Sequence, residues 1–230
     1  MLLCKCQGGK YMKKKFILLL SLPLLMGCNT VDNTKIKSDE NISATATSIE
    51  INQQVYTGKK VKVYLNPSVQ TWNQYVNNLG TEAEHMNNIA HYMYDELVAY
   101  NYIDVKANFD YLALKDSVKE SNTFNADIHF AIHSNAGGGQ GSEILTNKNS
   151  TSFASKMYEG FMELGNFKRR GIKDGNSLYE IKNSKAENKA LIELLFHDNL
   201  LEAKYIIENE KIIAHQLVLA MTSFILNNLM

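Results

Sequence analysis

The sequence has few cysteines and prolines, and this scarcity excludes several classes of protein. Its 230 residues include three cysteines, two prolines and one tryptophan. A disulfide-stapled secreted scaffold needs a dense cysteine framework, and a collagen-like chain needs regular glycine and proline. With 45% hydrophobic residues, the chain is instead long and apolar enough to build one substantial core. We therefore expect a single globular domain.

The chain also lacks an excess of basic charge once its N-terminus is set aside. The formal net charge is zero, but five lysines and no acidic residue lie within residues 1–27. The remainder carries 19 basic and 24 acidic side chains. Nucleic-acid-binding proteins usually present a basic face, so this balance argues against nucleic acid as a partner.

The N-terminus predicts an export signal. Met12 is followed by three lysines and by an apolar run, residues 16–26, that is too short to span a bilayer as a stable helix. The run ends in Leu25-Met26-Gly27-Cys28, which is similar to the bacterial lipobox, where the cysteine is diacylated and becomes the new N-terminus. We predict a lipoprotein signal peptide over residues 12–28, with lipid attached at Cys28 outside the cell membrane. An ordinary secretory cleavage site near a cysteine is the alternative.

Residues 1–11 are predicted to be an untranslated upstream segment. Gly8-Gly9-Lys10-Tyr11 can be encoded by GGAGGUAAAUAU, a ribosome-binding sequence, so Met12 is the expected start. The two upstream cysteines then fall outside the protein, and lipidation of Cys28 leaves the exported domain with neither a free thiol nor a disulfide. Residues 29–59 are polar and without an apolar period, which is typical of a flexible tether.

Strand and helix patterns alternate along residues 60–230. Short apolar runs with β-branched residues are typical of buried strands, and apolar residues three and four positions apart are typical of helices. This alternation predicts an α/β fold with a mainly parallel or mixed twisted sheet and helices on both faces. The expected strands are residues 60–66, 102–109, 126–136, 178–181 and 190–196, with a short extended piece at 141–145. The expected helices are residues 82–100, 112–118, 152–164, 200–208 and 211–226.

The strand expected at residues 126–136 ends in a histidine beside a glycine-rich turn. Ligands of open α/β sheets bind outside the carboxyl ends of the strands, which makes His133 a candidate functional residue. His129 lies on the same face but deeper in the strand, where we expect a hydrogen-bonded core histidine.

Glu193 lies in the middle of an apolar strand. A buried ionised carboxylate without a partner is costly, so Glu193 must be paired, bound to a metal or shifted in its pKa. A structural salt bridge and a functional acid are both compatible with this position.

Two acidic residues open the first expected helix. Thr81 and Glu84 form a capping box, whereas Glu82 heads the apolar stripe and points toward the sheet. His85 and His91 lie off that stripe and are expected to face solvent.

Several motifs follow one another in an order typical of a known family. They are Glu82 with Asn87 and residues 89–90, residues 131–136 with Gly141-Ser142-Glu143, Arg170-Gly171-Ile172-Lys173, and residues 190–193 with Asn199 and Glu202. Together they resemble the zinc-dependent N-acetylmuramoyl-L-alanine amidases of the Amidase_3 type. The resemblance covers about residues 61–230 and is greatest to a Gram-positive branch.

The resemblance implies that residues 60–230 are a catalytic domain, which hydrolyses the amide between N-acetylmuramic acid and L-alanine in peptidoglycan. It implies that His133 and Glu82 bind Zn²⁺ and that Glu193 is the catalytic glutamate. Asn135 and Arg170 are expected to contact the substrate. His197 is expected to cap the end of a strand, or to support the site as a further acid or ligand.

The sequence departs from the family at the end of the first strand. The family has a histidine in a D-P-G-H-G-G turn, but this chain reads Asn66-Pro67-Ser68-Val69-Gln70-Thr71. Gln70 is the nearest polar substitute, and an amide oxygen is a weaker zinc ligand than an imidazole. Two hypotheses stay open: an active amidase with Gln70 or water as the third ligand, and a degenerate amidase-like domain that binds cell-wall glycopeptide or a protein partner. The retention of Glu193 favours the first. A zinc peptidase of another kind is less favoured, because the sequence has no H-E-x-x-H motif.

Overall fold

A six-stranded mixed sheet organises residues 56–230, the part of the chain that this computed structural model describes. The strands lie in the order β2-β1-β3-β6-β4-β5. β4 runs antiparallel to β6 and parallel to β5, whereas the pairs among β2, β1, β3 and β6 are all parallel. The bounds are β1 Val61–Pro67, β2 Ile103–Ala107, β3 Ile128–Asn135, β4 Ser142–Thr146, β5 Arg169–Asp174 and β6 Asn188–Phe196. The predicted α/β class is confirmed.

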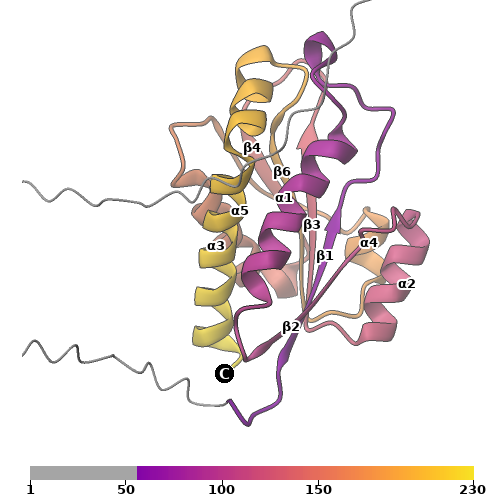
Figure 1. Cartoon of the computed structure of the whole chain (residues 1–230), viewed down its shortest axis with the longest axis vertical. Helices are drawn as coiled ribbons and strands as arrows, with labels where there is room; N and C mark the ends of the chain where they lie inside the picture. The colour runs from indigo at the N-terminus through magenta and orange to yellow at the C-terminus, as the bar shows by residue number, and fades with distance from the viewer. Residues whose placement is uncertain (1–55) are drawn as a thin grey trace, which may run out of the picture. The chain divides into compact units, whose positions relative to one another are not determined.

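Helices cover both faces of this sheet (Figure 1). The helices α1, α3 and α5 form one layer, and α2 and α4 lie against the opposite face. The main hydrophobic core lies between the sheet and the three-helix layer. The bounds are α1 Glu82–Leu97, α2 Leu114–Phe124, α3 Thr151–Met162, α4 Tyr179–Asn183 and α5 Leu200–Asn228, with short 3-10 turns at Val76–Asn78 and Lys148–Ser150.

Local sequence signals account for several helix ends. The hydroxyl of Thr81 accepts a hydrogen bond from the backbone N–H of Glu84, as the capping motif predicts. Asn199 caps α5 in the same way, and Asn125 ends α2 in the left-handed conformation. Helices α3 and α5 approach closely at Gly160, where an added Cβ would lie 2.6 Å from the Cβ of Ala220. These features set where α1 and α5 begin, where α2 ends and how closely α3 and α5 pack.

Two sequence expectations about the elements are wrong, and one strand was not expected. Residues 179–181 belong to the short helix α4 rather than to a strand, because a single turn also buries Glu180 and Ile181 against the sheet. Leu178 is the N-cap of this helix. The two C-terminal helices are one helix, α5, interrupted only at Asn209 by a non-helical backbone (φ −125°, ψ 16°). Strand β5 was not expected, because it is largely exposed and rich in basic residues, and so lacks an apolar pattern.

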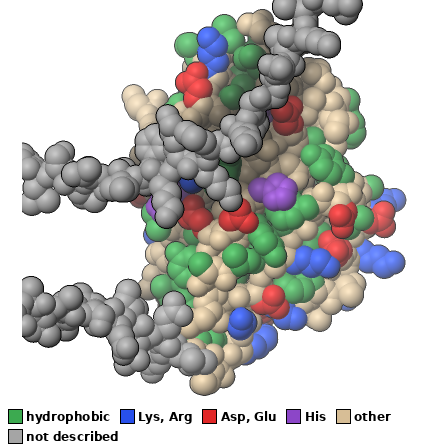
Figure 2. Space-filling view, in the orientation of Figure 1, with side chains coloured by type: hydrophobic (Ala, Val, Ile, Leu, Met, Phe, Trp, Pro, Cys, Tyr) green, Lys and Arg blue, Asp and Glu red, His purple; other side chains and the backbone are tan. Residues whose placement is uncertain are grey.

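The surface mixes charges of both signs. On the part of the face visible in Figure 2, basic and acidic side chains are interspersed among hydrophobic and uncharged polar ones. No helix within residues 56–230 is long and apolar enough to cross a membrane. The predicted upstream segment, the signal peptide with Cys28 and nearly all of the tether lie outside the described residues.

Candidate active site

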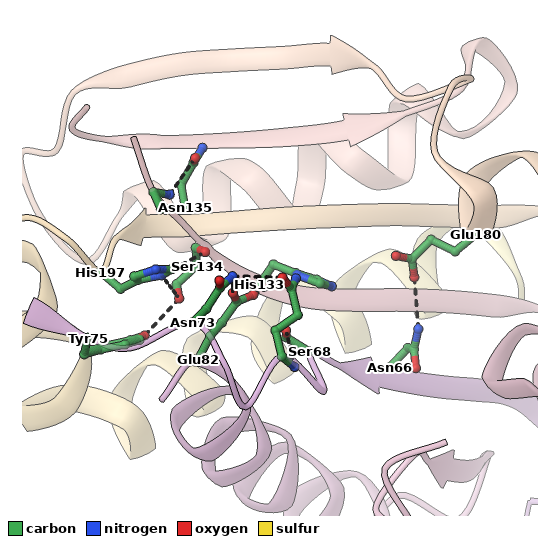
Figure 3. Close-up of polar contacts among 12 residues, drawn as sticks. Asn66, Ser68, Asn73, Tyr75, Glu82, His133, Ser134, Asn135, Glu180 and His197 are labelled. Atoms are coloured by element: carbon green, nitrogen blue, oxygen red, sulfur yellow. Dashed lines mark hydrogen bonds and ion pairs between the residues drawn. The ribbon is translucent and has the colours of Figure 1, made fainter. Parts of the chain in front are cut away.

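A histidine and a glutamate meet at the carboxyl edge of the sheet. Nδ1 of His133, near the end of β3, lies 2.9 Å from Oε1 of Glu82, in the first turn of α1. Figure 3 shows the two side chains turned toward each other. Glu82 is 1% exposed, so the prediction that it points inward from its helix is confirmed. The structure thus brings together two residues that are 51 positions apart in the sequence.

The charges of this pair stabilise each other. Burial raises the pKa of Glu82, but hydrogen bonds from His133 and Asn73 and the charge of His133 outweigh burial and lower it. Burial lowers the pKa of His133, but the bond to Glu82 and the surrounding carboxylates raise it to about 9. Without a bound cation, the pair is therefore an ionised carboxylate and a protonated imidazole.

A neighbouring amide pair completes the ring of polar groups. Asn73 Nδ2 donates to Glu82 Oε2 and to Gln70 Oε1, each at 2.8 Å. Gln70 Nε2 lies 3.4 Å from Nδ1 of His133. Asn73 thus orients Glu82 so that its other oxygen faces the histidine. No sequence pattern pointed to Asn73, because its role depends on a loop that folds back over the start of α1.

These side chains fit a divalent cation, with an incomplete set of strong ligands. Imidazole nitrogen, carboxylate oxygen and amide oxygen can all bind zinc, and the first two already converge at 2.9 Å. A flip of the Gln70 amide would turn its oxygen toward His133. Within residues 56–230, however, no three His, Cys, Asp or Glu side chains form a metal-binding group. The site can therefore hold zinc only with the help of Gln70 or water, and the cation must displace the proton of His133.

Strand register places a second carboxylate beside His133. Glu193 on β6 is the register partner of His133 on the parallel strand β3, so both side chains leave the same face of the sheet. Oε2 of Glu193 is buried and has no hydrogen-bond partner among the described residues. Burial raises the pKa of Glu193 to about 7, and the charges of nearby glutamates add to this rise against the opposing effect of His133. The salt-bridge alternative is not supported, because none of the ion pairs found in the described part of the chain includes Glu193.

A charged cluster lies on the far side of Glu193. Glu143 on β4 is its register partner across the antiparallel pair. Glu143 contacts Arg170 Nε at 3.0 Å and Arg170 Nη2 at 3.2 Å, and accepts a hydrogen bond from Asn135 at 2.9 Å. The guanidinium of Arg170 also lies over the ring of Phe196, 5.0 Å from its centroid. The two predicted substrate contacts, Asn135 and Arg170, are therefore held together by Glu143.

His197 contacts the residue that follows His133 on β3. Its Nδ1 lies 2.9 Å from the hydroxyl oxygen of Ser134, the residue after His133, and this hydroxyl accepts a hydrogen bond from Tyr75 at 3.0 Å. The rings of Tyr75 and His197 stack with their centroids 5.1 Å apart. All three side chains are buried. His197 therefore holds the end of β3 in place and lies behind the strand that carries His133.

Three further histidines lie away from the contact between His133 and Glu82. His129 is fully buried and contacts Ser121 and Glu180, as expected for a core histidine. His91 is exposed, as expected, and stacks on Phe109. The expectation that His85 faces solvent is wrong: its side chain is buried and contacts Glu210 at 2.7 Å. Helix α5 packs against α1 on this side, so α1 has a second buried face that its single apolar stripe did not indicate.

A cleft of about 520 Å³ opens beside His133. It lies between the loop that follows β1 and the segment between β2 and α2. Its lining includes His133 and Gln70 and two large aromatic side chains, Trp72 and Tyr111.

The sequence of residues 72–223 matches the Amidase_3 family, which is described as N-acetylmuramoyl-L-alanine amidase. This chain belongs to that family. The match covers more than half of the sequence and includes each of the predicted catalytic, zinc-binding and substrate-binding residues except Gln70. The match confirms the resemblance to the Amidase_3 family. It also confirms the predicted enzyme class, an N-acetylmuramoyl-L-alanine amidase. Among curated protein sequences, none matches the chain.

Solved amidase structures share the fold. The AmiC2 amidase of Nostoc punctiforme superposes with a TM-score of 0.66 at 15% identity, over 73% of this chain and 99% of that chain. The catalytic domain of the CwlV amidase from Bacillus (Paenibacillus) polymyxa var. colistinus gives 0.66 at 19% identity, over 72% and 98%. An N-acetylmuramoyl-L-alanine amidase from Clostridium difficile 630 gives 0.64 at 21% identity, over 74% and 100%. The described residues thus have the fold of an amidase catalytic domain.

Proposed function

We propose that this amidase is a zinc-dependent hydrolase of the bond between N-acetylmuramic acid and L-alanine in peptidoglycan, held by a lipid on the outer face of the cell membrane. The observation that carries the proposal is the convergence of three groups at one edge of the sheet. Glu82 and His133 are in contact, and Glu193 lies beside them with a pKa raised to about 7. A cation-binding pair with a nearby base is one arrangement that can hydrolyse an amide at neutral pH.

Each residue has a distinct role in this proposal. His133 and Glu82 would hold Zn²⁺, with Gln70 or water in a further position. When bound, zinc lowers the pKa of water and polarises the amide carbonyl. Glu193 would take the proton of the attacking water and return it to the leaving nitrogen, because its side chain lies beside His133 and its buried Oε2 has no hydrogen-bond partner among the described residues. Asn135 and Arg170 would position the substrate beside this group.

The proposal is tested by replacing the base. Glu193→Gln keeps the shape of the side chain and removes its capacity to accept a proton, so we expect hydrolysis to fall by roughly 10²–10⁴-fold. The measurement is the release of new N-terminal alanine from purified peptidoglycan, together with the melting temperature. Glu187→Gln is the matched control, because Glu187 is exposed just before the same strand.

Two results would contradict the zinc mechanism. One is wild-type turnover in Glu193→Gln, and the other is hydrolysis that persists after a chelator has removed all metal. If the wild-type protein binds peptidoglycan and never cleaves it, the degenerate binding domain becomes the better explanation. The missing first-strand histidine keeps that second function in consideration, whereas the unpartnered Glu193 carboxylate disfavours it, because a binding module gains nothing from such a buried acid.

The lipid anchor needs a separate test, because it depends on residues outside the described part of the chain. In cells that express the full chain, we expect a labelled fatty acid to be incorporated and the protein to fractionate with membranes. Cys28→Ser should abolish both. Release of an unlipidated wild-type protein into the medium would instead indicate ordinary secretion.

A further inference from the structure

The strand order sets out the polar groups in a row along the carboxyl edge of the sheet. The cleft lies beside β1 and β2, at one end of the row. His133 on β3 and Glu193 on β6 follow in the middle, and Glu143 on β4 with Arg170 on β5 lie at the other end. A substrate that lies across the strand ends would therefore meet two different surfaces on either side of Glu193.

Aromatic side chains line the outer part of the cleft. Trp72 is 70% exposed and Tyr111 is 47% exposed, although both are large and hydrophobic. Tyr111 has a φ of 55°, in the left-handed region that a residue with a Cβ rarely adopts. Such strained residues are concentrated at ligand-binding positions, where the surrounding structure maintains them.

The inner part of the cleft is polar and buried. Asn66 Nδ2 donates to Glu180 Oε2 at 3.0 Å, and Asn108 Nδ2 donates to Asn66 Oδ1 at 3.2 Å. All three side chains are at most 5% exposed, and all line the cleft. Figure 3 shows Asn66 and Glu180 on one side of His133 and Asn135 on the other. The cleft therefore combines exposed aromatic walls with a buried floor, whose polar groups already bond to one another.

This combination suits a sugar ring better than a peptide. A pyranose has apolar C–H faces, which pack on aromatic rings, and hydroxyl groups, which can stay in contact with water where the cleft opens. Among the described residues, no lysine or arginine lines the cleft, and Nδ1 of His133, at its edge, already faces Glu82, so the free carboxylates of a stem peptide would find no available cationic partner there. Arg170, at the opposite end of the row, is partly exposed, and the guanidinium N–H groups that do not face Glu143 can donate to such carboxylates.

We propose that the cleft between Trp72 and Tyr111 binds the glycan sugar rings on the muramoyl side of the cleaved amide, with the peptide extending toward Arg170. The assignment rests on the proposed function, because that function supplies a substrate with a sugar end and a peptide end. It adds the direction in which this substrate crosses the sheet.

Intrinsic fluorescence tests the proposal, because Trp72 is the single tryptophan of the chain. The sugar probe is the disaccharide of N-acetylglucosamine and N-acetylmuramic acid, with its lactyl carboxyl capped as a methyl amide. The peptide probe is the free stem peptide. We expect the disaccharide to shift Trp72 emission and the peptide to leave it unchanged. In calorimetric titrations, Tyr111→Ala should weaken disaccharide binding by about tenfold, whereas Tyr92→Ala, a partly exposed tyrosine outside the cleft, should not change it.

A Trp72 shift caused by the peptide in place of the disaccharide would overturn the proposal, and so would the absence of any shift with either probe. These outcomes are separable from failure of the proposed function. Hydrolysis of peptidoglycan without a disaccharide-induced shift would leave the amidase mechanism standing and remove the sugar site. Disaccharide binding at Trp72 without any hydrolysis would retain the sugar site and favour the binding-domain alternative.

Discussion

Two histidine–glutamate pairs that share strand β3 have opposite surroundings. His129 contacts Glu180 at 3.2 Å, with side-chain exposures of 0% and 5%. His133 contacts Glu82 at 2.9 Å, with exposures of 15% and 1%, and its ring lines the cleft. The inner pair is closed off by Ser121 and Asn66, whereas the outer pair is surrounded by Gln70, Glu193 and open space.

This comparison shows that position along the strand, and not residue type, separates the two roles. Both pairs combine an imidazole with a carboxylate, and both histidines project from the same face of β3. In the inner pair, protein groups satisfy the hydrogen-bonding capacity, so the pair contributes to stability. Beside the outer pair, Oε2 of Glu193 has no hydrogen-bond partner among the described residues. A cation or a substrate can therefore still bind next to His133. The predictions below test this division.

The largest expected effect is on metal content. His133→Ala removes the imidazole of the outer pair, so we expect the protein to lose zinc at a free-metal concentration that just saturates the wild type. Activity should be lost with it. Metal analysis after equilibrium dialysis measures the change, with His91→Ala as a surface control. Stoichiometric zinc in His133→Ala would show that the metal, if bound, lies elsewhere.

The second effect is on stability. His129→Ala leaves the Glu180 carboxylate buried without its hydrogen-bond partner on β3, which costs about 2–3 kcal/mol of unfolding free energy. Urea denaturation measures this loss. If the two pairs have separate roles, the folded fraction of His129→Ala should still bind zinc as the wild type does. A variant that lost zinc while keeping its stability would reverse the assignment of the two pairs.

The inner pair also predicts a dependence of stability on pH. Burial raises the pKa of Glu180, but the hydrogen bond and charge of His129 outweigh burial, so the pKa is lowered. A carboxyl with a lowered folded pKa stabilises the fold above its unfolded pKa, about 4.3, and this stabilisation is lost as the pH falls through the folded value. We expect unfolding free energy to decrease as the pH falls below about 4.5. Glu180→Gln should reduce that slope, and Glu187→Gln should retain it.

The smallest expected effect concerns the incomplete ligand set of the outer pair. Gln70→His restores an imidazole at the position where the sequence departs from the family, so zinc affinity should rise by about tenfold, or 1.4 kcal/mol. Competition with a fluorescent chelator measures it. Gln74→His, in the same loop, should leave the affinity unchanged, because the Gln74 side chain bonds to the backbone of Thr71. An unchanged affinity in Gln70→His would exclude this position as a ligand.

Much of the site could be predicted because its residues conflict with their local pattern. Glu193 is an acid within an apolar strand, His133 is a histidine at a strand end, and Glu82 heads an apolar helical stripe. Each conflict is visible within a few residues of sequence. Asn73 and Glu143 show no such conflict, since an asparagine in a loop and an acid near a turn are ordinary. The role of Asn73 depends on the path of its loop, and that of Glu143 on Arg170, 27 residues away.

The sequence by itself determined the alternation of strands and helices, the inward direction of Glu82 and the lack of a first-strand histidine. These follow from periodicity and residue identity, which are local. The tertiary structure alone decided the strand order, the buried place of His85, the helical form of residues 179–183 and the row of groups from the cleft to Arg170. Strand pairing and helix packing depend on contacts between residues distant in sequence, and no local pattern encodes which of those distant residues will meet.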